Sequence, residues 1–183
     1  DLGSGAGLPG LVMAIRRPDL DVHLVEPMLR RTNWLADAVL ELGLENVTVH
    51  RGRAEDFAGV LRAPVVTARA VARLDKLARW AVPLLETSQP EVPARLVAMK
   101  GSSAAQELAE TRAQLVRLGL IEGLVREHGQ SLLDVPVLTV DLTFTTSPAG
   151  RPVRKAAAAG RGSRPSRRTR AKGAGGNGDR GPG

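Results

Sequence analysis

The chain opens with a glycine-rich stretch, Asp1-Leu2-Gly3-Ser4-Gly5-Ala6-Gly7-Leu8-Pro9-Gly10. Glycine adopts positive φ values readily and leaves the backbone bare, so a ligand can approach a glycine turn closely. The next strand-like segment ends in an acid, Glu26. An acid at the end of a strand beside such a turn can hold the hydroxyl groups of a ribose. Together the two features predict a pocket for a nucleoside.

The spacing of the glycines separates two kinds of nucleoside pocket. In the dinucleotide-binding fingerprint, G-x-G-x-x-G, the third glycine packs the helix on the sheet and the helix N-terminus faces a pyrophosphate. Here the loop reads D-x-G-x-G-x-G. This form, with an acid just before the first glycine, resembles the first motif of S-adenosylmethionine-dependent methyltransferases, whose cofactor has no phosphate for the helix to bind. Taken alone, the motif leaves an ordinary glycine-rich turn as the alternative.

The composition indicates one globular domain and fits a reducing compartment without proving one. The chain has 183 residues, of which 43% are hydrophobic, and this is enough for a single domain with a core of its own. It has no cysteine, which excludes disulfides, zinc sites built from thiolates and a cysteine nucleophile. Its three histidines have no histidine or acid at metal-ligand spacing, so we expect structural roles for them and no metal ion. No apolar run approaches about 18 residues and no signal-like start is present. We expect a soluble, cytoplasmic monomer without a membrane partner.

The net charge of +7 is concentrated at the end of the chain. Residues 151–183 hold ten lysines and arginines and one acid, whereas residues 1–150 hold 16 basic and 18 acidic residues. A segment so poor in large apolar residues cannot bury enough surface to offset its chain entropy. We therefore expect a domain at residues 1–148 and a disordered basic tail at residues 149–183. The tail is either simply solvated or a weak, nonspecific nucleic-acid-binding extension.

Strand-like and helix-like segments alternate over residues 1–145, which predicts an α/β fold with a parallel sheet and helices on both faces. The expected strands cover residues 21–26, 46–50, 64–68, 95–99, 123–127 and 137–144, and the expected helices cover residues 8–17, 29–42, 55–61, 74–85 and 104–118. The chain starts inside a motif and without methionine, so we expect a fragment that lacks its first strand. With that strand the sheet would have about seven strands, as in the Rossmann-like methyltransferase fold.

Ligands of such sheets bind beyond the carboxyl ends of the strands, and four sequence blocks lie there. They are the glycine loop, the run Arg53-Ala54-Glu55-Asp56-Phe57, the stretch Thr67-Ala68-Arg69-Ala70 and the pair Lys100-Gly101. In order and spacing they are similar to the RsmG (GidB) family, whose members methylate N7 of one guanine in 16S ribosomal RNA. The resemblance covers residues 1–145. The missing first strand, the missing N-terminal helical region and the basic tail depart from the family pattern.

The resemblance implies S-adenosyl-L-methionine as the cofactor. It also implies cofactor contacts from Gly3, Leu8, Ala54, Glu55 and Arg69, to which the residues themselves add Gly5 from the glycine turn and Glu26 for the ribose. Arg69 can pair either with the methionine carboxylate of the cofactor or with an RNA phosphate, since a guanidinium suits both. The alternatives are a solvated acid at the end of a strand for Glu26 and a surface arginine for Arg69.

Four cations near these strand ends are candidates for RNA binding, namely Arg30, Arg31, Arg53 and Lys100. The first two lie in the first turn of an expected helix, where the helix dipole disfavours positive charge, so an external anion would explain them. For each of the four, a solvated surface charge is the alternative. Aromatic residues are scarce, and we expect Trp34 and Trp80 to pack in the core or at the rim rather than to stack on bases.

Residues that the chain lacks narrow the reaction. Methylation of pyrimidine C5 requires a cysteine nucleophile. Methylation of exocyclic amines usually involves an Asn/Asp-Pro-Pro-aromatic turn, and this chain has Thr67-Ala68-Arg69-Ala70 in that place. N7 of guanine has a free lone pair, so alignment of the reactants, with Arg69 as a possible participant, is sufficient. We expect an rRNA (guanine-N7)-methyltransferase that acts on 16S ribosomal RNA or the small-subunit particle. An NAD-dependent oxidoreductase and a non-catalytic RNA-binding module are the alternatives.

Overall fold

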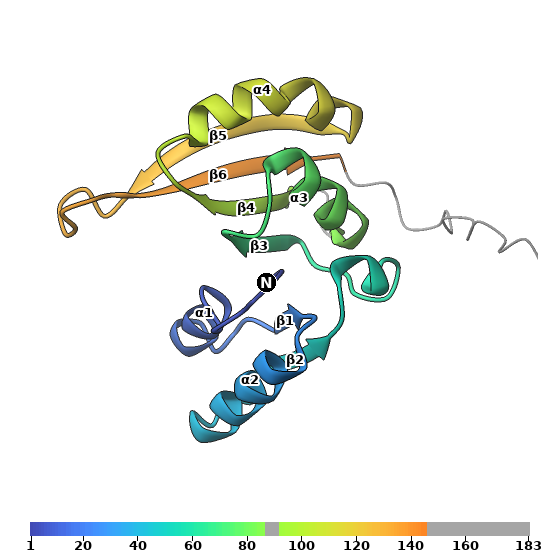
Figure 1. The fold of residues 1–183 in the computed structure, drawn as a ribbon, viewed down its shortest axis with the longest axis vertical. Helices are drawn as coiled ribbons and strands as arrows, with labels where there is room; N and C mark the ends of the chain where they lie inside the picture. The colour runs from blue at the N-terminus through green and yellow to red at the C-terminus, as the bar shows by residue number, and fades with distance from the viewer. Residues whose placement is uncertain (87–91, 146–183) are drawn as a thin grey trace, which may run out of the picture. The chain divides into compact units, whose positions relative to one another are not determined.

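Strands and helices alternate along the chain in the computed structural model, which describes residues 1–86 and 92–145 (Figure 1). The strands are β1 (Val22–Glu26), β2 (Val47–Arg51), β3 (Val65–Arg69), β4 (Ala94–Lys100), β5 (Leu120–His128) and β6 (Val137–Phe144). The helices are α1 (Gly10–Arg16), α2 (Leu29–Glu41), α3 (Leu74–Ala81) and α4 (Ala104–Arg117), with two 3-10 helices, η1 (Ala54–Phe57) and η2 (Val82–Leu84). Each expected element is present, with ends that differ by a few residues. The expected domain boundary at residue 148 lies outside the described residues.

The middle of the sheet is parallel, and the glycine loop starts inside it. β1 pairs with β2 and β3 pairs with β4, both in parallel. Leu2 joins the two pairs, because its backbone forms parallel bridges to Val25 of β1 and to Ala68 of β3. The amide of Leu2 donates to the Thr67 carbonyl, and the amide of Gly3 donates to the Val25 carbonyl, each at 2.8 Å. The loop therefore begins between β1 and β3, where Figure 1 marks the N-terminus.

The other edge of the sheet departs from the expected parallel arrangement. The strand order there is β3-β4-β6-β5, and β6 runs antiparallel to both β4 and β5. Only residues 129–136 link β5 to β6, whereas a parallel crossover needs about a dozen residues or more. The short link therefore turns the chain back as a hairpin. The described residues contain six strands, so the expected count of about seven is not confirmed.

Two apolar clusters fix the helices to opposite faces of the sheet. Successive side chains of a strand point to opposite faces. Leu24 of β1 packs with Leu11 of α1 and Leu35 of α2, whereas the next residue, Val25, belongs to the second cluster. That larger cluster packs β3, β4 and β6 against α3 and α4, and α4 lies over β5 and β6 (Figure 1). The prediction of helices on both faces is confirmed. In residues 1–86 and 92–145, no helix combines the length and apolar character required to cross a membrane.

A histidine pair connects β1 to β2. His23 Nδ1 and His50 Nε2 are 2.8 Å apart, and a hydrogen bond between them requires one of these nitrogens to be unprotonated. Burial, assisted by charge on His23 and on the N-terminal amine, lowers the pKa of His50 below its ordinary value of 6.5, although Asp21 opposes the shift. Neutral His50 is therefore the form that folding favours.

The free energy of unfolding should therefore fall as the pH drops below about 6.5, because the unfolded chain takes up a proton at His50 before the folded protein does. Denaturant titrations at a series of pH values from 8 to 5 would measure this. His50→Gln cannot titrate at this position and should make the profile less steep in that window. A slope from the N-terminal amine remains in the variant, because burial lowers the pKa of that amine to about 5. Profiles of equal slope in the two proteins would contradict the assignment.

Candidate functional site

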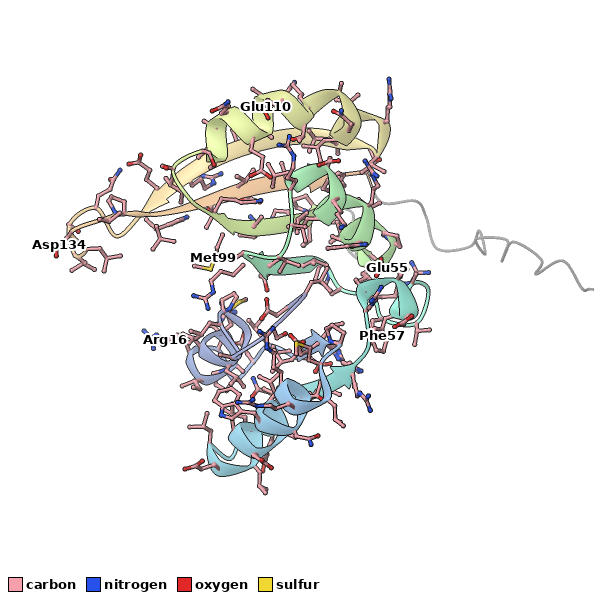
Figure 2. All side chains as sticks on the ribbon, viewed as in Figure 1. Arg16, Glu55, Phe57, Met99, Glu110 and Asp134 are labelled. Carbon is pink, nitrogen blue, oxygen red and sulfur yellow. The ribbon has the colours of Figure 1, made fainter. Side chains whose placement is uncertain are left out.

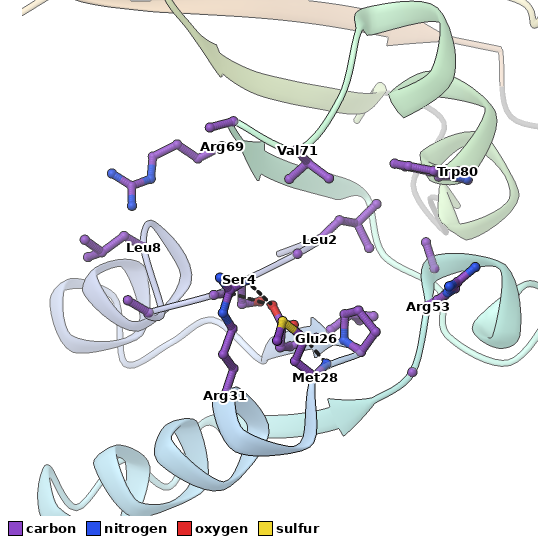
Figure 3. Close-up of a pocket in the computed structure, with 18 of the residues that line it drawn as sticks. Leu2, Ser4, Leu8, Glu26, Met28, Arg31, Arg53, Arg69, Val71 and Trp80 are labelled. Carbon is purple, nitrogen blue, oxygen red and sulfur yellow. Dashed lines mark hydrogen bonds and ion pairs between the residues drawn. The ribbon is translucent and has the colours of Figure 1, made fainter.

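A cavity of about 930 Å³ opens where β1, β2 and β3 end (Figure 3). Its walls are the glycine loop, the end of β1 with the start of α2, the η1 turn, the segment after β3 and part of α3. These segments are far apart in the sequence. The parallel strands bring them together, because the carboxyl ends of parallel strands meet at one edge of the sheet.

The cavity collects nearly all of the residues that the sequence singled out. The predicted cofactor residues Gly3, Gly5, Leu8, Glu26, Ala54, Glu55 and Arg69 all line it, and so do the predicted RNA-binding cations Arg30, Arg31 and Arg53. A second cavity of about 870 Å³ is lined by none of these residues. The structure therefore places the predicted residues around one space, and what each of them binds stays a prediction.

Backbone conformation explains why the loop needs glycine. Gly3 and Gly5 have φ values of +65° and +56°, in the left-handed region that other residues rarely adopt. A Cβ atom on Gly5 would meet only the Gly3 carbonyl oxygen, at 3.7 Å, so the protein itself leaves the space beside Gly5 open. A Cβ atom on Gly7 would instead overlap the side chain of Leu11. Gly5 thus borders open space in the cavity wall, whereas Gly7 allows α1 to pack.

Glu26 is a buried carboxylate in the floor of the cavity. Its side chain is only 2% exposed. Oε2 accepts a hydrogen bond from the Gly5 amide and Oε1 accepts one from the Met28 amide, both at 3.0 Å. The guanidinium of Arg31 lies 3.8 Å from Oε2. Glu26 therefore holds the glycine turn and the start of α2 together, which is a structural role that the sequence did not reveal (Figure 3).

The acid before the first glycine has a different position. Asp1 Oδ1 accepts a hydrogen bond from the Thr67 hydroxyl at 3.0 Å, and Oδ2 accepts one from the Gly10 amide at 3.3 Å. Asp1 lines the second cavity rather than the first. It therefore ties the start of α1 to β3 and supports the glycine loop from behind.

The η1 turn closes the side of the cavity beyond β2. Its entry is fixed by the Arg53 amide, which donates to Asp56 Oδ2 at 2.8 Å. Glu55 is exposed and lines the cavity, whereas Phe57 of the same turn is partly buried and packs against His50, with the ring centroids 5.4 Å apart (Figure 2). The turn therefore presents Ala54 and Glu55 to the cavity while Phe57 anchors it.

Met28, Val71 and Lys76 of the wall were missed by the sequence reasoning. Trp34 and Trp80, which were expected in the core or at the rim, also line the cavity. Trp34 is 50% exposed, and Lys76 Nζ lies 5.0 Å from the centroid of the Trp80 ring. Their position on the rim could have been inferred from helical spacing. Residues three or four apart share a helix face, so Trp34 shares one with Arg30 and Arg31, and Trp80 shares one with Lys76.

Lys100, the fourth predicted RNA-binding cation, does not line the cavity. Its Nζ donates to the Ala72 carbonyl at 2.7 Å and to Glu107 Oε1 at 2.9 Å. The side chains of Lys100 and Glu107 are each only 13% exposed. The ammonium is thus occupied by internal partners, and we do not count Lys100 among the RNA-binding residues.

The histidines lie away from this cavity. His23 and His50 contact each other, and His128 Nε2 lies 2.8 Å from the Thr139 hydroxyl. None of the three lines the first cavity. Within the part of the chain that the structure describes, no group of three or more histidines and acids is arranged to hold a metal ion.

The family follows from the sequence over most of the chain. The sequence model of the GidB family, described as rRNA small subunit methyltransferase G, matches residues 1–132. The chain belongs to the GidB family. The resemblance inferred from the four sequence blocks is therefore confirmed.

Relatives in the GidB family are about 50% identical to this chain over the residues that align. A protein from Rhodococcus jostii (strain RHA1), named Ribosomal RNA small subunit methyltransferase G, is 51% identical over 144 residues, which cover 76% of this chain and 60% of the relative. A protein of the same name from Thermobifida fusca (strain YX) is 50% identical over 147 residues, covering 80% of this chain and 60% of the relative. The chain thus spans about 60% of the length of these GidB relatives.

Solved structures similar to this GidB chain share little sequence identity with it. A SAM-dependent methyltransferase from Aquifex aeolicus has a TM-score of 0.55 and 17% identity, covering 78% of this chain and 79% of that chain. M. jannaschii TYW2, solved in complex with AdoMet, has a TM-score of 0.56 and 20% identity, covering 80% and 68%. The likeness shows the fold alone, and it confirms the expected Rossmann-like methyltransferase architecture.

Proposed function

We propose that the protein transfers the methyl group of S-adenosyl-L-methionine to N7 of a guanine in 16S ribosomal RNA. Membership of the GidB family supports this. The structural observation that carries it is the buried Glu26 carboxylate, which holds the glycine turn at Gly5 and shares one cavity with Glu55 and Arg69. A bare glycine turn beside an acid at the end of a strand is the arrangement that a nucleoside requires.

The cavity fits this cofactor by its size and by its polar groups. Its volume of about 930 Å³ lies within the range of about 300–1,000 Å³ that is usual for small-molecule sites. Each carboxylate oxygen has two lone pairs, so Glu26 can bind a ribose diol in addition to its two amide partners. Glu55 and the backbone of Ala54 suit the edge of an adenine, and the guanidinium of Arg69 suits the methionine carboxylate. In Figure 3 the Arg69 side chain extends on the same side of the cavity as Leu8.

The proposed reaction requires positioning more than acid-base chemistry. When bound, S-adenosyl-L-methionine supplies a methyl group that leaves the sulfonium sulfur as N7 forms its bond. The N7 lone pair lies in the plane of the base, so no proton has to be removed first. None of the described histidines lines the cavity, and Glu26 already accepts two amides. Alignment of the two reactants is therefore sufficient, and Arg69 is the candidate for holding them.

The arginines of the rim would bind the RNA. Arg30 and Arg31 lie in the first turn of α2, and Arg53 directly precedes η1. All three are exposed. Guanidinium groups bind phosphate oxygens through paired hydrogen bonds, and such contacts position a nucleic acid without reading its sequence. Since Arg31 lies 3.8 Å from Glu26, we assign the larger share to Arg30 and Arg53.

We further propose a cytoplasmic monomer whose sheet has seven strands. Support for the seventh strand is the position of Leu2, which bridges Val25 and Ala68 as a strand between β1 and β3 would. The tail at residues 149–183 lies outside the described residues. Its two predicted roles, a solvated tail or a weak, nonspecific nucleic-acid-binding extension, stay predictions.

The alternative functions have weaker support. An NAD-dependent oxidoreductase would need a proton donor such as tyrosine or histidine near its substrate, but the chain has no tyrosine and none of the described histidines reaches the cavity. A non-catalytic RNA-binding module would not need a glycine turn and a buried acid around a cavity.

RNA in which 7-deazaguanine replaces the target guanine should bind but should not be methylated. The replacement removes the N7 lone pair and keeps the Watson–Crick edge, so we expect an unchanged dissociation constant and a rate at least about 1,000-fold lower, because the nucleophile is absent. Transfer of label from methyl-labelled cofactor would measure the rate, with unmodified RNA of the same sequence as the control. Methylation of the deaza RNA would move the acceptor to another atom.

A further inference from the structure

Lys100 and Glu107 form an ion pair that lies almost entirely inside the protein. Lys100 is the last residue of β4, and Glu107 lies in the first turn of α4. Their side chains are 13% exposed, and Lys100 Nζ is 2.9 Å from Glu107 Oε1. A buried ion pair of this kind is weak evidence for stability, because desolvation offsets the attraction. A role in placing a neighbouring segment is therefore worth testing.

The pair holds the segment that leads from β3 into α3. Lys100 Nζ donates to the Ala72 carbonyl at 2.7 Å. Glu107 Oε1 accepts a hydrogen bond from the Leu74 amide, also at 2.7 Å. The Leu74 amide is one of the donors at the start of α3 that have no partner within the helix, and Arg73, the N-cap residue, gives it no side-chain cap. The pair therefore forms hydrogen bonds to the backbone on both sides of Arg73.

The two residues just before Ala72 form part of the wall of the proposed cofactor cavity. Ala70 and Val71 both line it. Ala70 has a φ value of +53°, which a non-glycine residue keeps only where the surroundings impose it. Val71 covers the glycine loop closely, since a Cβ atom on Gly3 would lie 3.0 Å from Val71 Cγ2 (Figure 3).

We propose that Lys100 and Glu107 are positioning residues for the cofactor cavity. Through Ala72 and Leu74 they hold Ala70 and Val71 against the glycine loop, so that the cavity is shaped before the ligand arrives. This inference rests on the proposed function. It also assigns Lys100 of the Lys100-Gly101 block a structural role inside the protein, in place of the RNA contact that the sequence suggested.

The test is Lys100→Met, which keeps the aliphatic stem and removes the charge. We expect the dissociation constant for S-adenosylhomocysteine to rise about tenfold by calorimetry, because binding must then also order the wall. Glu107→Gln keeps an acceptor for the Leu74 amide but loses the charge, and it should give a similar rise. The double variant should be no worse than either single one, because both changes remove the same interaction. Lys100→Arg keeps charge and donors and should retain most of the affinity.

Arg95→Met is the matched control, since Arg95 also lies on β4 and pairs with Asp141 at 3.2 Å, outside the first cavity. It should leave the dissociation constant unchanged whatever it does to the melting temperature. If Lys100→Met changes the melting temperature but leaves the affinity within twofold, the pair is merely structural and the inference is overturned.

Hydrogen exchange of the ligand-free protein separates this inference from the proposed function. In Lys100→Met, the amides of residues 70–74 should exchange at least about tenfold faster, with other regions unchanged, because local opening becomes easier. A uniform change, or none at 70–74, would overturn the inference. Failure of the wild-type protein to bind S-adenosylhomocysteine would contradict the proposed function instead, and the exchange result would still decide whether the pair holds the wall.

Discussion

Gly5→Val should weaken the binding of S-adenosylhomocysteine at least about 100-fold, a loss of about 2.7 kcal/mol, in a protein that still folds. Gly5 has a φ of +56°, and the space beside it is free of other protein atoms except the Gly3 carbonyl oxygen. A valine side chain would fill the space that the ligand needs, and it would strain the turn that donates to Glu26. Calorimetric titration would measure the affinity, with NADH as a second titrant that should give no binding heat.

Gly43→Val is the matched control for backbone strain. Gly43 has a φ of +60°, nothing lies within 4 Å of its Cβ position, and it follows the end of α2 away from the cavity. Both variants should lose about 1–2 kcal/mol of stability or somewhat more from the left-handed conformation. Only Gly5→Val should lose affinity. Equal affinities in the two variants would remove Gly5 from the binding site.

Glu26→Ala should lower both stability and affinity. The Gly5 and Met28 amides would lose the buried Glu26 carboxylate that accepts their part-buried hydrogen bonds, and each donor left unsatisfied costs about 1–3 kcal/mol. We expect the free energy of unfolding to fall by about 2–6 kcal/mol on this basis. The ribose would also lose its proposed partner, so S-adenosylhomocysteine should bind at least about 100-fold more weakly under conditions where the variant is folded.

Two further variants test whether the lost hydrogen bonds of Glu26 cause these losses of stability and affinity. Glu26→Gln keeps one carbonyl oxygen, so its losses should fall between those of the wild-type protein and Glu26→Ala. Glu122→Ala removes an exposed acid on β5 and should change stability by no more than about 0.5 kcal/mol. A Glu26→Ala protein as stable as Glu122→Ala would show that the two amides find other partners.

Much of the candidate site was predictable because its residues follow strands. Glu26, Ala54, Glu55 and Arg69 stand at or just after the carboxyl ends of β1, β2 and β3, and parallel strands place such ends together. Their common cavity therefore follows from the order of the elements. Their individual ligands do not follow from it, since position alone does not show what a side chain binds.

The sequence by itself determined the elements and the glycine loop of this protein, whereas the tertiary structure decided their partners. The spacing of apolar residues and the turn residues that end each element involve only near neighbours along the chain. The helices and strands could therefore be located from the sequence. The sequence could not show that β6 runs antiparallel, that Lys100 donates to the Ala72 carbonyl, or that Val71 packs over Gly3. Each depends on which distant elements pack together, and the same charged or apolar side chain serves equally well at the surface until that packing encloses it.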